Sequence, residues 1–151
     1  MDLILWRHAE AEDGFPDLER ALTHKGIRQA QKTAEFLQAR LPDDVRVLVS
    51  PAARTRQTAE ALTRDYTLAP TIAPGASADA VLQAVRWPDA EGSVLVVGHQ
   101  PTLGAVAARL LGISNNSSLS VRKSAVWWFS GRERDGLFTV SLKLVMPPEL
   151  L

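Results

Sequence analysis

Residues 94–99 read Val-Leu-Val-Val-Gly-His, an unbroken apolar run that ends in a turn glycine and a histidine. A run this short, without polar alternation, is typical of a β-strand buried on both faces, as in a parallel sheet. Two further strand candidates occur earlier in the chain: residues 3–6 are also unbroken and apolar, and residues 45–49 are apolar except for Arg46. Together the three runs predict the central strands of one sheet.

Segments with helical periodicity separate these strands, which predicts an α/β fold with a mainly parallel central sheet. Thr23 caps a predicted helix that Pro42 ends, and further helices are predicted over 53–64, 77–87 and 101–112. The apolar residues that recur at helical spacing in the first helix are Ile27, Ala30, Ala34, Leu37 and Leu41.

The C-terminal third predicts an antiparallel hairpin. Strands over 126–129 and 137–145 flank an Asp135-Gly136 turn signal, and apolar and polar residues alternate along the second strand. At least one antiparallel strand should therefore join the sheet. The length and the absence of repeats or low-complexity tracts predict a single domain over residues 1–151.

Composition narrows the class of protein. The 17 basic and 17 acidic side chains cancel, so the chain has no overall basic field for nucleic acid. Cysteine is absent, which excludes disulfides and thiolate metal sites. No stretch approaches the roughly 20 apolar residues of a membrane helix, and the N-terminus is unlike a signal peptide. We expect a cytoplasmic protein with neither a nucleic-acid nor a membrane partner.

A polar motif follows each of the three buried strands: Arg7-His8, then Ser50 to Arg54, then Gly98-His99. The carboxyl ends of parallel strands line one edge of a sheet, so these side chains should converge. Arginine forks match phosphate geometry, and the helices after the second and third motifs point their N-termini at the same edge. The pattern predicts a phosphoryl site in which His8 is the nucleophile, kept neutral by the neighbouring positive charge.

A metal site is the alternative interpretation of the same residues. Zinc could bind His8 and His99 together with a nearby carboxylate. However, no His-x-x-x-His spacing exists, and Arg7 beside the first ligand would repel a cation, so phosphate is favoured. Three further polar residues are interpreted as surface positions, namely His24, Lys123 and Ser124.

The motifs resemble those of the histidine phosphatase (phosphoglycerate mutase-like) superfamily. Residues 3–9, Leu-Ile-Leu-Trp-Arg-His-Ala, are similar to its Arg-His-Gly signature, and residues 50–59 and 96–99 are similar to its second and third motifs. The compact chain, residues 20–26 (Arg-Ala-Leu-Thr-His-Lys-Gly) and residues 99–104 resemble the small SixA-type phosphohistidine phosphatases.

This resemblance implies a three-layer α/β/α sandwich, a covalent phosphohistidine on His8, and hydrolysis of that intermediate by water. It implies no metal or other cofactor. The residues that would hold the phosphoryl oxygens are Arg7, Arg54 and His99. We also assign Arg20 and Gly14, in the loop after His8, to phosphate or substrate binding.

The motifs identify the nucleophile and the phosphate-binding residues, but they do not identify a general acid. Larger members of the superfamily place an acidic residue in an insertion after the second motif, but residues 62–79 contain only Asp65 and Asp79, and neither matches that pattern. An alkoxide leaving group needs a strong acid, whereas the imidazole of a phosphoramidate needs less help. The acids that remain near the site are Glu10, Glu12 and Asp13.

These observations predict a phosphatase that acts on a phosphohistidine-bearing protein of a phosphorelay or phosphotransfer system and releases inorganic phosphate. Two alternatives remain open: a small-molecule phosphomonoesterase of the same superfamily, and a non-catalytic phosphate-binding module that regulates a partner.

Overall fold

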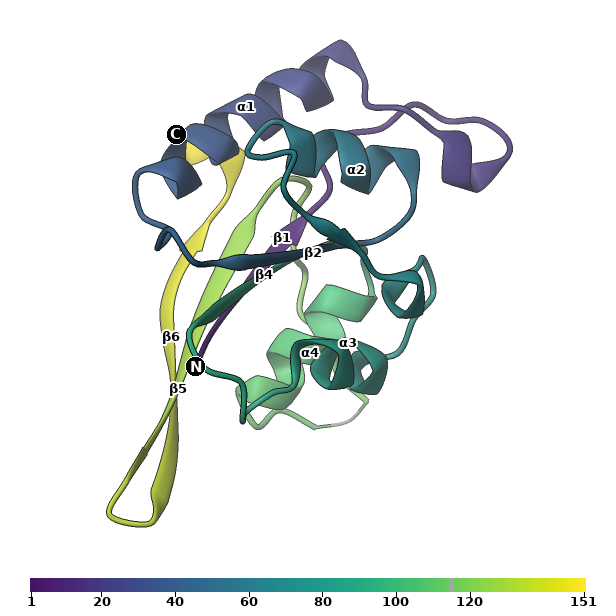
Figure 1. The fold of residues 1–151 in the computed structure, drawn as a ribbon. Coiled ribbons are helices and arrows are strands. Elements are labelled where there is room, and N and C mark those ends of the chain that lie inside the picture. The colour runs from purple at the N-terminus through teal and green to yellow at the C-terminus, as the bar shows by residue number, and fades with distance from the viewer. Residues whose placement is uncertain (115) are drawn as a thin grey trace.

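The computed structural model describes residues 1–114 and 116–151 and has an α/β fold (Figure 1). Within these residues one sheet contains six strands in the order β3-β2-β4-β1-β5-β6. The strands are β1 (Asp2–Arg7), β2 (Arg46–Val49), β3 (Thr67–Leu68), β4 (Ser93–Gly98), β5 (Val126–Arg134) and β6 (Leu137–Met146). The first four pair in parallel, whereas β5 and β6 are antiparallel, which confirms the predicted mixed sheet.

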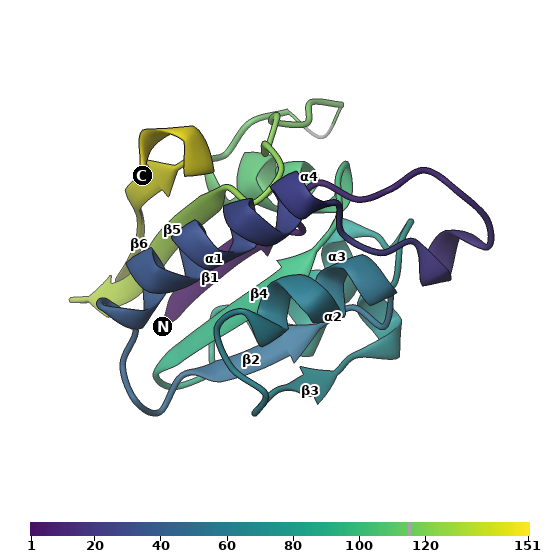
Figure 2. The same cartoon turned by 90° about the horizontal axis from the view of Figure 1, so that it is seen from above.

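Helices cover both faces of the sheet, which confirms the predicted three-layer sandwich. The helices α1 and α2 lie on one face, and α3 and α4 lie on the other (Figures 1 and 2). The α-helices are α1 (His24–Gln38), α2 (Ala53–Glu60), α3 (Ala78–Val85) and α4 (Thr102–Leu110). Short 3₁₀ helices are η1 (Asp17–Glu19), η2 (Pro70–Ile72) and η3 (Pro148–Leu150). No helix among the described residues has the length and apolar character needed to span a membrane.

The central position of β1 explains its apolar sequence. It pairs in parallel with β4 and antiparallel with β5, so both of its edges are hydrogen-bonded. Successive side chains enter opposite layers: Leu3 and Leu5 pack with α3 and α4, whereas Ile4 and Trp6 pack with α1 and α2. A strand with two buried faces has no polar alternation. The register places Arg7 opposite Gly98, so β1 and β4 end at the same level.

Several predicted segments differ from the structure in detail. The helices predicted over 53–64 and 101–112 end at Glu60 and Leu110. Strand β5 continues to Arg134 instead of ending at 129, because its polar second half still pairs with β6. Ile27, which shares the apolar spacing of α1, is 42% exposed. It lies in the first turn of the helix, where Gly26 and not Ile27 packs against the chain after β1.

Gly26 sets the distance between α1 and the segment that follows His8. A Cβ at this position would lie 1.9 Å from the carbonyl oxygen of Glu10. We expect Gly26→Ala to lower the free energy of unfolding by about 1–3 kcal/mol, because backbone must move to admit the methyl group. Urea denaturation measures the effect, with the exposed Gln31→Ala as a control expected within about 0.5 kcal/mol of wild type. Helix propensity alone predicts that Gly26→Ala stabilises, and that result would contradict the contact.

Candidate active site

The three polar motifs meet at one edge of the sheet. His8 follows β1, His99 follows the neighbouring β4, and Arg54 lies in the first turn of α2, after β2. The rings of His8 and His99 are 5.3 Å apart between centroids. His8, Arg54 and His99 are all buried although they are polar. The structure therefore brings these predicted residues together, with Arg7 at the end of β1 beside them.

His8 is held in one tautomer. Its Nδ1 lies 2.7 Å from the carbonyl oxygen of Ala9, which can only accept, so Nδ1 carries the proton and donates it. In the neutral ring Nε2 then bears the free lone pair. Burial, together with the charges of Arg7 and Arg54, lowers the pKa of His8 to about 4 in spite of that hydrogen bond. His8 is thus a neutral imidazole with an unprotonated Nε2 at neutral pH.

His99 is also neutral. Its Nε2 lies 2.7 Å from the Oγ of the buried Ser50. Burial, followed by the nearby His8 and Arg54, lowers the pKa of His99 to about 3. If the Ser50 hydroxyl donates to Nε2, the ring proton of neutral His99 is on Nδ1. That arrangement leaves Nδ1 of His99 as a hydrogen-bond donor.

The site contains buried nitrogens without hydrogen-bond partners: two are arginine donors, and the third, on His99, is a donor when the Ser50 hydroxyl donates to Nε2. Across residues 1–114 and 116–151, three of the four buried side-chain nitrogens that lack a hydrogen-bond partner belong to this site, and they are Arg7 Nε, Arg54 Nε and His99 Nδ1. A buried donor that makes no hydrogen bond is costly, so native proteins leave few of them. An anion with several oxygens is the kind of ligand that satisfies such a set.

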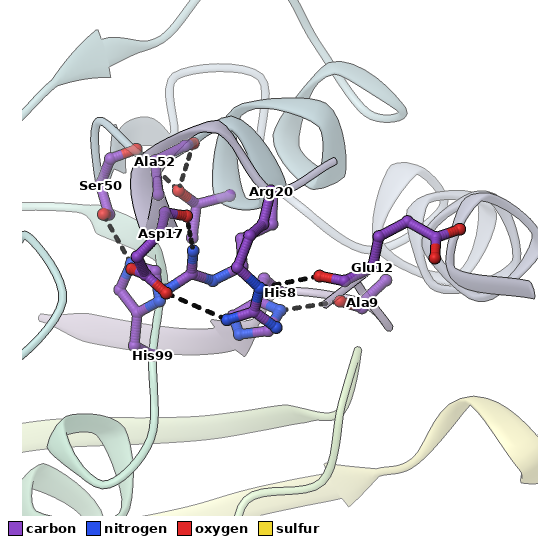
Figure 3. Close-up of polar contacts among 10 residues, drawn as sticks. His8, Ala9, Glu12, Asp17, Arg20, Ser50, Ala52 and His99 are labelled. Carbon is purple, nitrogen blue, oxygen red and sulfur yellow. Dashed lines mark hydrogen bonds and ion pairs between the residues drawn. The ribbon is translucent and has the colours of Figure 1, made fainter. Parts of the chain in front are cut away.

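Asp17 contributes a carboxylate that the sequence analysis missed. It lies in η1 and accepts from two arginines: Arg54 Nη2 is 3.1 Å from Oδ2, and Arg20 Nη1 is 3.1 Å from Oδ1 (Figure 3). Arg54 Nη1 also donates to the Asp17 carbonyl oxygen at 2.9 Å. These hydrogen bonds from Arg20 and Arg54 hold the pKa of Asp17 below its usual value. The sequence feature that could have identified Asp17 is its position three residues before Arg20.

Arg20 reaches the site through the same loop. Its Nε donates to the Glu12 carbonyl oxygen at 2.7 Å, and its charge contributes to the lowered pKa of His8. Gly14 lies at an exposed position of the loop, with a φ of +148°. No described hydrogen bond connects Gly14 with His8, Arg54 or His99, so the structure brings Arg20 to the site but not Gly14.

None of the three predicted acids has a described hydrogen bond or ion pair from its carboxylate to His8, Arg54 or His99. The Glu10 carboxylate accepts from the Thr23 hydroxyl at 2.8 Å and so supports the start of α1. Glu12 and Asp13 are exposed, around a shallow pocket of about 260 Å³. Within the described residues, Asp17 is the carboxylate that contacts an arginine of the cluster. No group of three or more histidine and carboxylate side chains that could hold a metal ion occurs there either.

The second motif holds the loop after β1 in place. Thr58 Oγ1 accepts from the backbone N–H of Ala9 at 3.0 Å and donates to the Arg54 carbonyl oxygen at 2.7 Å. Gln57 Oε1 accepts from the backbone N–H of Leu22 at 2.7 Å. The Gln-Thr pair of this motif therefore couples α2 to the segments on both sides of the loop that contains Asp17.

The interpretation of Ser124 as a surface residue was wrong. Ser124 is fully buried, and its backbone N–H donates to the carbonyl oxygens of Arg7 and His8, each at 3.1 Å. Its Oγ is 3.2 Å from Trp6 Nε1 and 3.0 Å from Thr33 Oγ1. The chain must turn here to bring β5 alongside β1, and Ser124 does so with a φ of +58°. Lys123 and His24 are exposed, as predicted.

Comparisons with known proteins agree with this geometry. The model of the histidine phosphatase superfamily (branch 1) matches residues 3–77. An uncharacterized protein of Mycobacterium tuberculosis is 36% identical over 124 residues, which cover 74% of this chain and 73% of that protein. The phosphohistidine phosphatase SixA of Escherichia coli K12 is 31% identical over 119 residues, which cover 73% of this chain and 74% of SixA.

A solved structure of the protein histidine phosphatase SixA complexed with tungstate has the same fold. It matches with a TM-score of 0.81 and 26% identity, and the match covers 99% of both chains. This chain therefore belongs to the histidine phosphatase superfamily, where it is a phosphatase of the SixA type.

Proposed function

We propose that the protein removes the phosphoryl group from a phosphorylated histidine of another protein, through a covalent phosphohistidine on His8. The observation that carries this proposal is the set of unpartnered buried donors, on Arg7, Arg54 and His99, around a neutral histidine whose Nε2 is free to attack. The SixA relatives support the same substrate class.

The first step transfers the phosphoryl group to the enzyme. Nε2 of His8 forms a bond to phosphorus as the bond between phosphorus and the substrate imidazole breaks. The substrate ring takes one proton from solvent water on its other nitrogen, so that it leaves as a neutral imidazole. Arg7, Arg54 and the Nδ1 proton of His99 donate to the phosphoryl oxygens, whose charge they stabilise in the transition state. Loss of a proton from His8 Nδ1 is not needed, because the Ala9 carbonyl oxygen accepts its hydrogen bond throughout.

The second step returns the enzyme to its starting state. Water attacks the phosphorus of phosphohistidine, the bond to Nε2 breaks, and inorganic phosphate leaves. His8 is again a neutral ring with its proton on Nδ1. The same donors serve both steps, since the phosphoryl group stays between the same residues.

The carboxylate at the site favours an imidazole over an alkoxide as the leaving group. Asp17 accepts hydrogen bonds from two arginines, which lower its pKa and keep it ionised. Its carboxylate is therefore a poor proton donor. The Glu10 carboxylate accepts a hydrogen bond from the Thr23 hydroxyl. An alkoxide without a proton donor is a poor leaving group, whereas an imidazole can leave neutral after protonation.

The test traps the intermediate and compares substrates. The enzyme is mixed with a substrate protein that carries ³²P-phosphohistidine, and the reaction is quenched in alkali. The label on the enzyme, separated from the substrate protein, is then tested in acid. We expect an acid-labile, alkali-stable label and at least about 10²-fold higher kcat/KM for phosphohistidine than for phosphoserine peptides. Equal turnover of phosphate monoesters would favour the small-molecule phosphomonoesterase. Binding of phosphate without any turnover would favour a non-catalytic module.

Asp17 is paired with the Arg54 guanidinium, so we expect it to compete with a bound anion for that group. We expect Asp17→Asn to bind tungstate, a phosphate analogue, about 3- to 5-fold more tightly, since a partly exposed ion pair with Arg54 no longer has to be broken. Inhibition by tungstate measures this affinity, and the exposed Asp13→Asn on the same loop is the matched control. Weaker binding by Asp17→Asn would show instead that the carboxylate positions Arg54 for the anion.

The buried histidines also make stability depend on pH. The pKa of His8 is about 4 and that of His99 about 3, both below the ordinary histidine value of 6.5. At a pH between the folded and the ordinary pKa values, the unfolded chain therefore binds more protons than the folded chain. The free energy of unfolding should therefore fall as the pH is lowered from about 6.5 to 4. Urea denaturation at a series of pH values measures the decline.

His8→Asn is the control for this dependence. It removes one of the two buried rings, so its stability should decline less steeply than that of wild type over the same pH range. Identical slopes for the two proteins would mean that His8 does not resist protonation in the folded state.

A further inference from the structure

A groove rich in cations opens beside the active site and shares Arg7 with it. It has a volume of about 820 Å³ and lies between α1, residues 120–123 and η3. We refer to it as the basic groove. Its cations are Arg7, Lys25, Arg28, Lys32, Arg122 and Lys123, against one lining carboxylate, that of Glu149. Because the whole chain has equal numbers of basic and acidic residues, this charge is a local concentration.

Most of these cations are not neutralised within the described part of the chain. Arg122 pairs with Glu149 at 2.8 Å, but no described ion pair involves Lys25, Arg28 or Lys32, all of which are exposed. Arg28 and Lys32 are four residues apart on α1, a like-charge spacing that destabilises a helix. Among residues 1–114 and 116–151, no ion pair offsets this repulsion, so the charges suit a ligand from outside the chain.

The walls of the basic groove are tied to the nucleophile. Lys123 directly precedes Ser124, whose N–H donates to the carbonyl oxygens of Arg7 and His8. On the opposite wall, Gln29 Oε1 accepts from the Glu10 N–H at 2.9 Å, two residues after His8. Thr33 of α1 also donates to the Ser124 carbonyl oxygen at 2.9 Å, so the two walls are joined. A ligand in the groove is therefore held at a fixed place relative to His8.

We propose that the basic groove binds an acidic segment of the protein substrate, so that carboxylates flanking the phosphohistidine dock along α1 while the phosphoryl group reaches His8. The proposal rests on the proposed function and adds a specificity for acidic sequence. The Glu149 carboxylate on Arg122 is an example, within the chain itself, of the contact that the groove makes. The groove is far larger than one phosphoryl group requires, and the charge attracts an acidic chain before it docks.

Two phosphohistidine peptides test the proposal. They are identical except that the residues flanking the histidine are glutamates in one and glutamines in the other, and both are phosphorylated with phosphoramidate. We expect wild type to hydrolyse the Glu peptide with at least about 10-fold higher kcat/KM, and added salt to reduce that ratio because exposed charges are screened. Equal rates for the two peptides would overturn the proposal.

Two double variants locate the effect. Arg28→Glu/Lys32→Glu reverses two charges of the groove, whereas Arg64→Glu/Arg134→Glu reverses two exposed charges elsewhere and changes the net charge equally. The ratio of the rates on the Glu and Gln peptides should fall to about one or below in the first variant and stay near the wild-type value in the second. A ratio that falls equally in both, or in neither, would overturn the assignment to the groove.

A binding measurement separates this proposal from the proposed function. Fluorescence anisotropy with the unphosphorylated, labelled Glu peptide reports on the groove without any catalysis. If neither phosphopeptide is hydrolysed, the proposed function fails. In that case, binding of the Glu peptide at least 10-fold weaker to Arg28→Glu/Lys32→Glu than to wild type would still support an acidic ligand in the groove. Binding of tripolyphosphate to the groove without binding of the Glu peptide would overturn the proposal in favour of a small polyanion.

Discussion

His8→Asn is expected to lower kcat/KM on phosphohistidine by about 10³-fold or more, the scale of loss seen when an enzyme loses its nucleophile. Asparagine offers no lone pair that can attack phosphorus at neutral pH, so no label should accumulate on the protein. The ring is buried between segments that other hydrogen bonds hold, and the substitution is smaller than histidine, so the fold should persist. Phosphate release and the trapped label measure the two effects.

The exposed His24 provides the matched control, since His24→Asn makes the same chemical change in the first turn of α1. Its activity should stay within about 2-fold of wild type, as expected for a surface substitution. Undiminished phosphate release by His8→Asn would rule out the covalent route and point to direct attack by water.

Arg54→Ala is expected to reduce kcat by about 10²–10³-fold, the usual effect of removing one donor that stabilises charge in the transition state. The guanidinium is buried, its Nε has no partner in the described residues, and its other nitrogens hold Asp17. Arg54→Lys should recover little activity, because a lysine cannot reproduce the planar fork. Steady-state kinetics with a phosphohistidine peptide measures all three proteins.

Arg56 lies two residues further along α2 and is exposed. Arg56→Ala removes the same charge from the same helix, so it should keep nearly full activity if the effect at Arg54 arises from contact with the phosphoryl group. Equal losses at both positions would indicate that the general positive charge of α2 matters and that no specific contact is made.

The parts of the site that follow strands could be predicted, because periodicity reveals strands and topology determines where they end. Apolar runs located β1 and β4, and the rule for parallel sheets then brought His8 and His99 together. The same reasoning placed Arg54, since it opens the helix after β2. That residues 1–151 form a single histidine phosphatase domain stays a prediction.

The irregular segments could not be predicted in the same way. Asp17 lies in a polar loop, and nothing in its sequence shows that η1 turns the carboxylate back onto Arg54. Ser124 resembles a surface residue because its neighbours Arg122 and Lys123 are charged. Its burial depends on β5 pairing with β1, a contact between distant parts of the chain. Propensity and spacing report on local structure and contain no information on such contacts.

The sheet order also has a consequence for how the protein becomes active during synthesis. Strand β1 leaves the ribosome well before its neighbours in the sheet, β4 and β5, which are made much later. At a synthesis rate of roughly 5–20 residues per second, several seconds pass before either strand that pairs with β1 has been made. The four buried apolar residues of β1, Leu3 to Trp6, are exposed during this time. We therefore expect nascent chains that end before β5 to lack phosphatase activity and to need protection from aggregation.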